Sequence, residues 1–236
     1  MNIAEFVEEC ATLGVELSPT MIDRFSLYVA MLLERNSKFN LTAIDTAAEV
    51  WRKHFLDSLS ARLVMQSEGE LIDVGSGAGF PGLPLAITCS GLQVTLVDSS
   101  TKRVQFLRDV VSALDLGDQV RIVPARAEDI GGAREHRERY DYAVARAVAS
   151  FGVLAEYCLP LVKRGGAMIA MKGPAGHQEL VSAQRGLKIL GGGEPAICAW
   201  TLPHGGEQRL LIVVTKLRAT PPKYPRRAGL PDKQPL

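Results

Sequence analysis

Four glycines stand within eight residues of the chain, at positions 75, 77, 79 and 82. The preceding residues, 71–74, are apolar apart from Asp73 and predict a short buried strand, whereas 83–87 predict the start of a helix. Glycine tolerates positive φ, its missing Cβ lets a ligand approach the main chain, and a helix start offers free N–H groups. A strand, a glycine-rich turn and a helix are together typical of a nucleotide-binding βα unit.

The glycine spacing fits two kinds of cofactor. Gly77, Gly79 and Gly82 match the Gly-x-Gly-x-x-Gly pattern of dinucleotide sites. Gly75, Gly77 and Gly79, preceded by Asp73, instead resemble the loop that binds S-adenosyl-L-methionine (AdoMet) in Rossmann-like methyltransferases. A hydride-transfer enzyme would need a second catalytic lobe. The predicted fold uses the whole chain, so the length favours AdoMet.

A second apolar strand favours a ligand site over a purely structural turn. Residues 92–97 follow the predicted helix and lead into Asp98. This acid comes about 20 residues after the turn, the spacing at which a carboxylate meets the hydroxyl pair of a ribose. After the third predicted strand, Glu128 or Asp129 is placed to accept from an adenine amine while the Ala127 backbone lines the ring. Charge alone equally allows these two acids to cap a helix.

The composition is that of a globular protein without a strong charge bias. The 236 residues are 47% hydrophobic and 22% charged, with a formal net charge of +1, so any nucleic-acid contact must come from a local basic patch.

Neither the histidines nor the cysteines have metal-ligand spacing, and we predict no metal site and reduced thiols. The N-terminus lacks a signal-peptide pattern and no apolar run is long enough to span a membrane, so we predict a cytoplasmic protein. The four scattered cysteines are Cys10, Cys89, Cys158 and Cys198.

Periodicity along the chain predicts an α/β fold in three parts. Residues 1–66 form an N-terminal helical extension, 67–217 an AdoMet-dependent methyltransferase domain, and 218–236 a basic, irregular surface arm. Strands and helices alternate in the middle part, which predicts a parallel sheet with helices on both faces. The expected architecture is a Rossmann-like class I methyltransferase fold, a mostly parallel seven-stranded sheet with an antiparallel terminal strand. The further strands expected are 120–123, 140–145 and 167–171, followed by a hairpin of 196–202 and 209–215.

Several segments together resemble one family. Residues 71–82, 125–129 and 145–148 are similar to the bacterial small-subunit ribosomal RNA guanine-N7 methyltransferases, also called glucose-inhibited division protein B. The similarity runs nearly end to end. It includes Asn-Leu-Thr-Ala-Ile at 40–44, His-Phe-Leu-Asp-Ser-Leu at 54–59, and the C-terminal segments 223–229 and 233–236.

The resemblance implies methyl transfer from AdoMet to N7 of a guanine in the 530 loop of 16S rRNA. Guanine N7 carries a lone pair and no proton, so direct in-line transfer needs no general base and positioning can supply most of the rate. We therefore assign no catalytic residue and expect Arg146 and Lys172 to position the reactants. Arg146 follows the fourth strand, where it is placed to clamp the AdoMet carboxylate or an RNA phosphate. From the glycine pattern and the resemblance, the expected cofactor-binding residues are Asp73, Gly75, Gly77, Gly79, Phe80, Asp98, Ala127, Glu128 and Arg146.

An RNA substrate requires positive side chains beside the pocket. Lys102, Arg126, Arg146 and Lys172 all fall in loops at the carboxyl edge of the predicted sheet and should converge there. We expect the partner to be 16S rRNA or the small-subunit particle, bound by a monomer without membrane contact. The expected RNA-binding residues are Lys102, Arg103, Arg126, Arg146, Lys172, Arg226 and Arg227.

Other assignments remain open beside this one. His54 and Asp57, at i and i+3, are interpreted as a structural pair, and Trp51 and Phe55 as core. A methyltransferase acting on a small molecule or a protein would share the fold. A non-catalytic protein that binds AdoMet or a nucleotide without turnover is a third possibility, against which the intact glycine turn and Asp98 argue.

Overall fold

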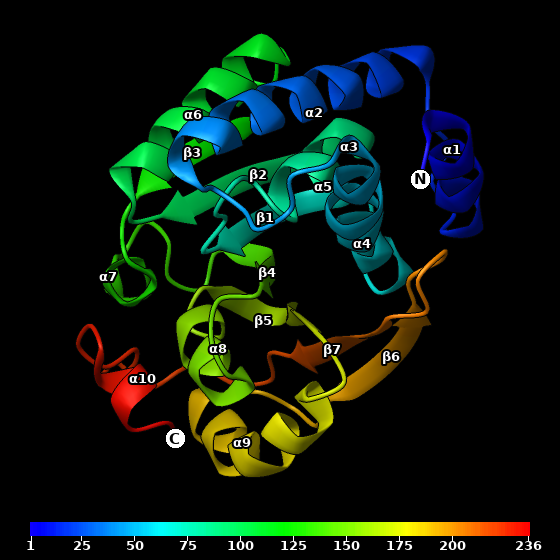
Figure 1. The fold of residues 1–236 in the computed structure, drawn as a ribbon. Coiled ribbons are helices and arrows are strands. Elements are labelled where there is room, and N and C mark those ends of the chain that lie inside the picture. The colour runs from blue at the N-terminus through cyan, green and yellow to red at the C-terminus, as the bar shows by residue number, and fades with distance from the viewer.

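The apolar stretches from residue 68 onward assemble into one seven-stranded sheet. The computed structural model describes residues 1–236. The strand order is β3-β2-β1-β4-β5-β7-β6 (Figure 1). Strands β1 to β5 pair in parallel, whereas β7 runs antiparallel to both β5 and β6. The predicted mostly parallel sheet with an antiparallel terminal strand is therefore confirmed. The strands are β1 (Glu68–Val74), β2 (Gly91–Asp98), β3 (Val120–Pro124), β4 (Tyr140–Arg146), β5 (Val162–Lys172), β6 (Ala196–Thr201) and β7 (Gln208–Thr215).

Helices cover both faces of this sheet, as expected from the alternating pattern (Figure 1). Successive side chains of a strand point to opposite faces, so Leu71 of β1 joins one hydrophobic core and Ile72 the other. On the Leu71 face lie α1 (Ile3–Thr12), α2 (Pro19–Phe39), α3 (Ala47–Glu49), the π-helical η1 (Val50–Leu56), α4 (Asp57–Leu59), the 3-10 turn η2 (Ser60–Leu63), α5 (Gly82–Thr88) and α6 (Thr101–Ala113). On the Ile72 face lie α7 (Ala127–Gly132), α8 (Phe151–Cys158) and α9 (Gly176–Leu190).

The N-terminal helices begin and end at residue types that favour helix ends. Ser18 caps α2 by accepting from the Met21 amide at 3.2 Å, with Pro19 in the first turn. Gly14 follows the end of α1 with φ of +71°. The helix expected around 54–59 is longer than predicted, because helical turns run without a break from Ala47 to Leu63.

The N-terminal helices share one core with the sheet. Trp51 and Phe55 are buried among aromatic rings of α1 and α2, which confirms their assignment to the core. Tyr28 of α2 donates a hydrogen bond to the Ala78 carbonyl in the glycine turn. The helical extension therefore reaches the turn that we expected to bind the cofactor.

The C-terminal arm is more ordered than its composition suggested. It ends in a short helix, α10 (Leu230–Lys233), and Tyr224 and Pro231 are buried. The Arg137 guanidinium donates to several carbonyls of the arm, including that of Tyr224 at 2.7 Å. Composition alone could not show this, because the partners that order the arm lie on distant elements.

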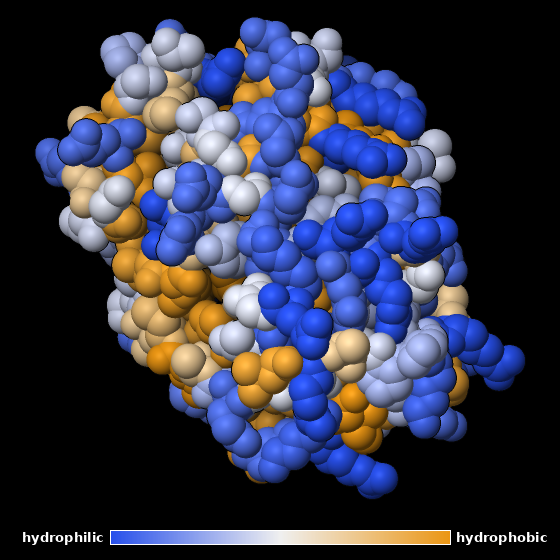
Figure 2. Space-filling model, turned by 180° about the vertical axis from the view of Figure 1, so that it is seen from behind, coloured by the Kyte–Doolittle hydropathy of each residue, from blue (hydrophilic) through white to orange (hydrophobic).

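Seen from behind, hydrophilic side chains cover much of the surface, and hydrophobic residues are visible mainly along the left side of the view (Figure 2). The large hydrophobic side chains left exposed include Val181 on α9 and Ile197 on the edge strand β6. No helix combines the length and the apolar composition needed to cross a membrane.

Candidate functional site

The glycine turn between β1 and α5 is tied to the end of β2. Gly75 and Gly77 have φ of +74° and +60°, a region that favours glycine. The amides of Gly75 and Ser76 both donate to the Val97 carbonyl at 2.9 Å, and the Ser76 hydroxyl accepts from the Val97 amide at 3.0 Å. These bonds hold the turn at the carboxyl edge of the sheet, where ligands bind in open α/β folds.

Asp73 and Gly79 support the turn from beneath. Asp73 is fully buried, and its Oδ2 accepts from the Gly82 amide at 2.9 Å. Its Oδ1 has no hydrogen-bond partner, and burial raises the pKa of this carboxyl to about 7. A Cβ on Gly79 would collide with Leu83 and the Tyr28 hydroxyl. Both residues face the protein and lie outside the lining of the cavity described next.

A cavity of about 440 Å³ opens beside the turn and is called here the glycine-loop cavity. Of the predicted residues it brings together Gly75, Asp98, Ala127 and Glu128, with Arg103 and Arg126 at its lining. The Asp98 carboxylate accepts from the amides of Gly77 at 3.0 Å and Ser100 at 2.8 Å, which fixes its position at the end of β2. The expected meeting of the turn with this acid is thus present in the structure.

Two glycines of the turn differ in the space around them, and of the two only Gly75 lines the cavity. A Cβ on Gly75 would lie 2.7 Å from Val148 Cγ2, so that side is closed by protein. A Cβ on Gly77 would meet no atom within 3.8 Å, the nearest being the Gly75 carbonyl oxygen at 3.9 Å. Space for a ligand therefore remains at Gly77.

Glu128 lies in the first turn of α7 and does not act as its cap, since the cap position belongs to Arg126. Its Oε1 accepts from the Tyr157 hydroxyl at 3.2 Å and from the Gly229 amide at 2.9 Å. Burial, followed by the Glu128 carboxylate, raises the pKa of Tyr157. One oxygen of Glu128 is thus committed to α8 and the C-terminal arm.

A second cavity of about 390 Å³, called here the arginine cavity, adjoins the first at Ala147, which lines both. Four basic residues line it: Lys53 from η1, Arg146 and Lys172 from the carboxyl ends of β4 and β5, and Arg209 from β7. His54 and Asp57 reach it from the N-terminal helices. Segments from the two ends of the chain therefore build one site.

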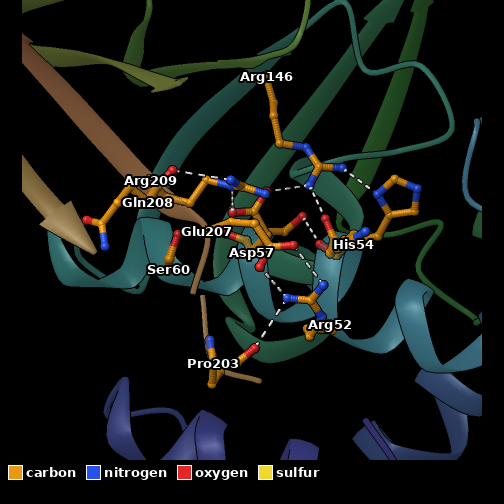
Figure 3. Close-up of polar contacts among 11 residues, drawn as sticks. Arg52, His54, Asp57, Ser60, Arg146, Pro203, Glu207, Gln208 and Arg209 are labelled. Atoms are coloured by element: carbon orange, nitrogen blue, oxygen red, sulfur yellow. Dashed lines mark hydrogen bonds and ion pairs between the residues drawn. The ribbon is translucent and has the colours of Figure 1, made fainter. Parts of the chain in front are cut away.

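Asp57 is shared by two guanidinium groups in this cavity. Its Oδ2 accepts from Arg146 Nη1 at 2.9 Å and its Oδ1 from Arg209 Nε at 3.0 Å (Figure 3). Arg146 Nη1 also donates to the Lys53 carbonyl at 2.9 Å, within η1. Asp57 and the Arg146 side chain are both largely buried, so this is an interior network rather than a surface ion pair.

The structure pairs His54 and Asp57 each with Arg146, not with one another. Burial and the neighbouring Arg146 charge lower the pKa of His54 to about 3, so the ring is neutral. Arginine is only a donor; the contact of 3.0 Å from Arg146 Nη2 therefore makes His54 Nδ1 the acceptor. His54 Nε2 then carries the proton and donates to Thr42 Oγ1 at 2.8 Å. Both ring nitrogens are engaged.

Phe80 lies under the arginine cavity rather than in the glycine-loop cavity. Its ring stacks on His54 at 4.3 Å and on Tyr28 at 5.5 Å between centroids. The Arg146 guanidinium carbon lies 5.1 Å from the Phe80 centroid, which is a cation–π distance. Phe80 therefore packs against both Arg146 and His54, the ring to which Arg146 donates.

The remaining basic residues expected to bind RNA differ in their distance from the two cavities and in their partners. Lys172 donates to the Ala149 carbonyl at 2.9 Å and pairs with Glu179 at 2.8 Å. Lys102 lines neither cavity and lies 5.4 Å above the Phe39 ring. Arg226 pairs with the buried Glu156 at 2.6 Å, while Arg227 is exposed. The carboxyl edge thus brings together Arg103, Arg126, Arg146 and Lys172.

Sequence reasoning missed Arg209 and the pair of Arg52 with Glu207. Arg52 Nη2 donates to Glu207 Oε1 at 2.8 Å and connects η1 to the β6–β7 hairpin (Figure 3). Arg209 lies 152 positions from Asp57 in the chain. No spacing rule could have found these pairs, because each joins segments from opposite ends of the sequence.

The sheet order, the glycine turn and the acid at the end of β2 define a Rossmann-like methyltransferase fold. Solved structures share it: cofactor-bound Rv0187 from MTB has a TM-score of 0.59 at 15% identity, covering 81% of this chain and 91% of that one. A putative S-adenosyl-L-methionine-dependent methyltransferase from Methanococcus maripaludis has a TM-score of 0.51 at 16% identity, covering 92% of both chains. At these identities the likeness concerns the fold alone.

Sequence relatives are much closer. The family described as "rRNA small subunit methyltransferase G" (GidB) matches residues 21–202, and the chain belongs to this family. The Ribosomal RNA small subunit methyltransferase G of Alkaliphilus oremlandii is 46% identical over 239 residues, and that of Leuconostoc mesenteroides is 47% identical over 240, each covering 100% of both chains.

Proposed function

We propose that this enzyme transfers a methyl group from AdoMet to N7 of a guanine in the 530 loop of 16S rRNA. Membership of the small-subunit rRNA methyltransferase family supports the reaction and the class of RNA. The observation that carries the proposal is the pair of cavities that meet at Ala147. One combines a glycine turn with an acid, and the other is lined by basic side chains.

The glycine-loop cavity fits AdoMet. The Asp98 carboxylate would accept from the two ribose hydroxyls, and the lack of any close contact at the Cβ position of Gly77 leaves the main chain of the turn accessible. Ala127 and Glu128 would flank the adenine. When bound, AdoMet supplies a methyl group on a positively charged sulfur.

The arginine cavity fits the guanine and its phosphate. Arg146, Lys172 and Arg209 provide donors suited to phosphate oxygens or to the O6 atom of guanine. His54 uses both ring nitrogens, and Asp57 is bound by two guanidinium groups. Neither is free to remove a proton, which accords with a nucleophile that carries none. The residues of this cavity would therefore work by positioning.

The test uses small subunits and naked 16S rRNA from a strain that lacks the enzyme. The full chain is incubated with methyl-labelled AdoMet, and the label is mapped by nuclease digestion. We expect 7-methylguanosine in the 530 loop. Label at another base, or only in proteins or small molecules, would contradict the proposal. Comparison of the two RNA forms identifies the preferred substrate. We also propose a monomer acting in the cytoplasm, which gel filtration with light scattering and cell fractionation would check.

A further inference from the structure

The C-terminal arm forms part of the wall of the glycine-loop cavity. Gly229 and Asp232, at the beginning and middle of the α10 region, both line it. The Gly229 amide donates to Glu128 Oε1 at 2.9 Å, which fastens the arm to α7. The last residues of the chain therefore lie beside the elements expected to hold the adenosine end of AdoMet.

A buried ion pair keeps this part of the arm in place. The Arg226 side chain binds both carboxylate oxygens of Glu156, with Nη2 to Oε2 at 2.6 Å and Nε to Oε1 at 2.9 Å. Arg226 Nη2 also donates to the Gln234 carbonyl at 2.8 Å, so one guanidinium spans α10. Glu156 on α8 is completely buried. Arg226 is thus a positioning residue for Asp232, an assignment different from the RNA contact expected for it.

The three carboxylates that line the cavity differ in how many hydrogen bonds they accept. Asp98 accepts from two backbone amides, and one oxygen of Glu128 accepts from Tyr157 and Gly229. Asp232 is exposed, and it lies close enough to Tyr157 to contribute, after burial and Glu128, to the raised pKa of that phenol. An acceptor with free capacity therefore faces the side of the cavity formed by α7 and α8.

We propose that Asp232 accepts a hydrogen bond from the adenine amino group of bound AdoMet, so that the C-terminal arm determines recognition of the base. The inference rests on the proposed function, which assigns the cofactor to this cavity. If Asp98 held the ribose, Ala127, Glu128 and Asp232 would line the part of the cavity left for the base. The exocyclic amine is the donor of adenine, and an ionised carboxylate is only an acceptor. Asp232 would discriminate adenine from a base with a carbonyl at that position.

The test compares binding of S-adenosylhomocysteine and S-inosylhomocysteine, which carries a carbonyl in place of the amine. Calorimetry on the full chain measures both dissociation constants for the wild type and Asp232→Ala. We expect wild type to prefer the adenosine compound by about tenfold or more, the usual effect of one charge-assisted hydrogen bond. In Asp232→Ala this preference should fall toward one, through weaker binding of the adenosine compound. Asp232→Asn, which keeps an acceptor oxygen, should lie between the two.

Glu135→Gln is the matched control, since it removes an exposed carboxylate outside the cavity and should leave both constants unchanged. An unchanged preference in Asp232→Ala, with wild type still binding S-adenosylhomocysteine and methylating RNA, overturns this inference and leaves the proposed function standing. If wild type binds neither compound, the cofactor assignment itself is wrong.

Discussion

The glycine-loop cavity and the arginine cavity lie at the same edge of one sheet but are built in different ways. The first depends largely on main-chain turns at the ends of successive strands, with its central acid held by backbone amides. The second depends on side chains from both ends of the chain, held by a carboxylate shared between two guanidinium groups. Loss of one side chain should therefore disturb the arginine cavity more than the glycine-loop cavity.

Arg146→Ala should have the largest effect. It removes bonds to Asp57, His54 and the Lys53 carbonyl together with a positive charge that lines the arginine cavity. We expect kcat/KM for small subunits to fall about 100-fold, as for the loss of roughly 3 kcal/mol of charge-assisted bonding. Affinity for AdoMet should change less than threefold by calorimetry, because Arg146 lies outside the glycine-loop cavity.

The control for this variant is Arg185→Ala, which removes an exposed arginine from α9. It should leave methylation unchanged. Thermal melting would establish that Arg146→Ala is folded. A loss of AdoMet affinity equal to the loss of RNA methylation would show that the two cavities are not separable and that Arg146 contacts the cofactor.

Gly77→Asp should act first on the binding of AdoMet, whereas Arg146→Ala should lower methylation and leave AdoMet affinity nearly unchanged. A Cβ at this position would make only an ordinary van der Waals contact, with the Gly75 carbonyl oxygen at 3.9 Å, so the fold is retained apart from the strain of a positive φ, about 1–2 kcal/mol. The new carboxylate would project into the space left for the cofactor, near Asp98. We expect AdoMet affinity to fall more than tenfold by calorimetry. Unchanged affinity would remove this turn from the cofactor site.

Lys172→Ala should lower methylation less than Arg146→Ala does. Like that variant, it should lower methylation and leave AdoMet affinity unchanged. Lys172 lines the arginine cavity but is already paired with Glu179, so part of its charge is compensated. A drop of about tenfold in kcat/KM for small subunits is expected, with AdoMet affinity retained. Lys188→Ala on the exposed face of α9 serves as the control. Full activity of Lys172→Ala would place the RNA elsewhere.

Asp73→Asn should act on stability more than on methylation. Because burial raises the pKa of Asp73 to about 7, the folded state keeps its proton between about pH 4 and pH 7 while the unfolded state releases it. Raising the pH through this window therefore destabilises the fold. From pH 5 to pH 8 the wild type should lose on the order of 2 kcal/mol more than Asp73→Asn in urea unfolding. If the free energy of unfolding changed equally with pH in the two proteins, Asp73 would not have the raised pKa.

The fold and the glycine-loop cavity were largely predictable from sequence. Apolar runs predict the strands, and the glycine turn and Asp98 belong to one βαβ unit, so local rules are enough to predict that they meet. The arrangement of the arginine cavity was not predictable. The sequence suggested a pair of His54 with Asp57, whereas the structure binds both to Arg146, about 90 positions away. The C-terminal arm looked irregular because Glu156, the partner of Arg226, is 70 positions away in the chain.

The order of strands and helices, the glycine turn and the acid at the end of β2 follow from the amino-acid sequence alone, because they depend on short-range backbone preferences. Tertiary structure decided which charges neutralise one another. It placed Asp57 between Arg146 and Arg209, occupied both nitrogens of His54, and brought Asp232 to the wall of the glycine-loop cavity. The physical reason is that an ion pair depends on distance in space, which a chain sets only after its two ends have packed on the same sheet.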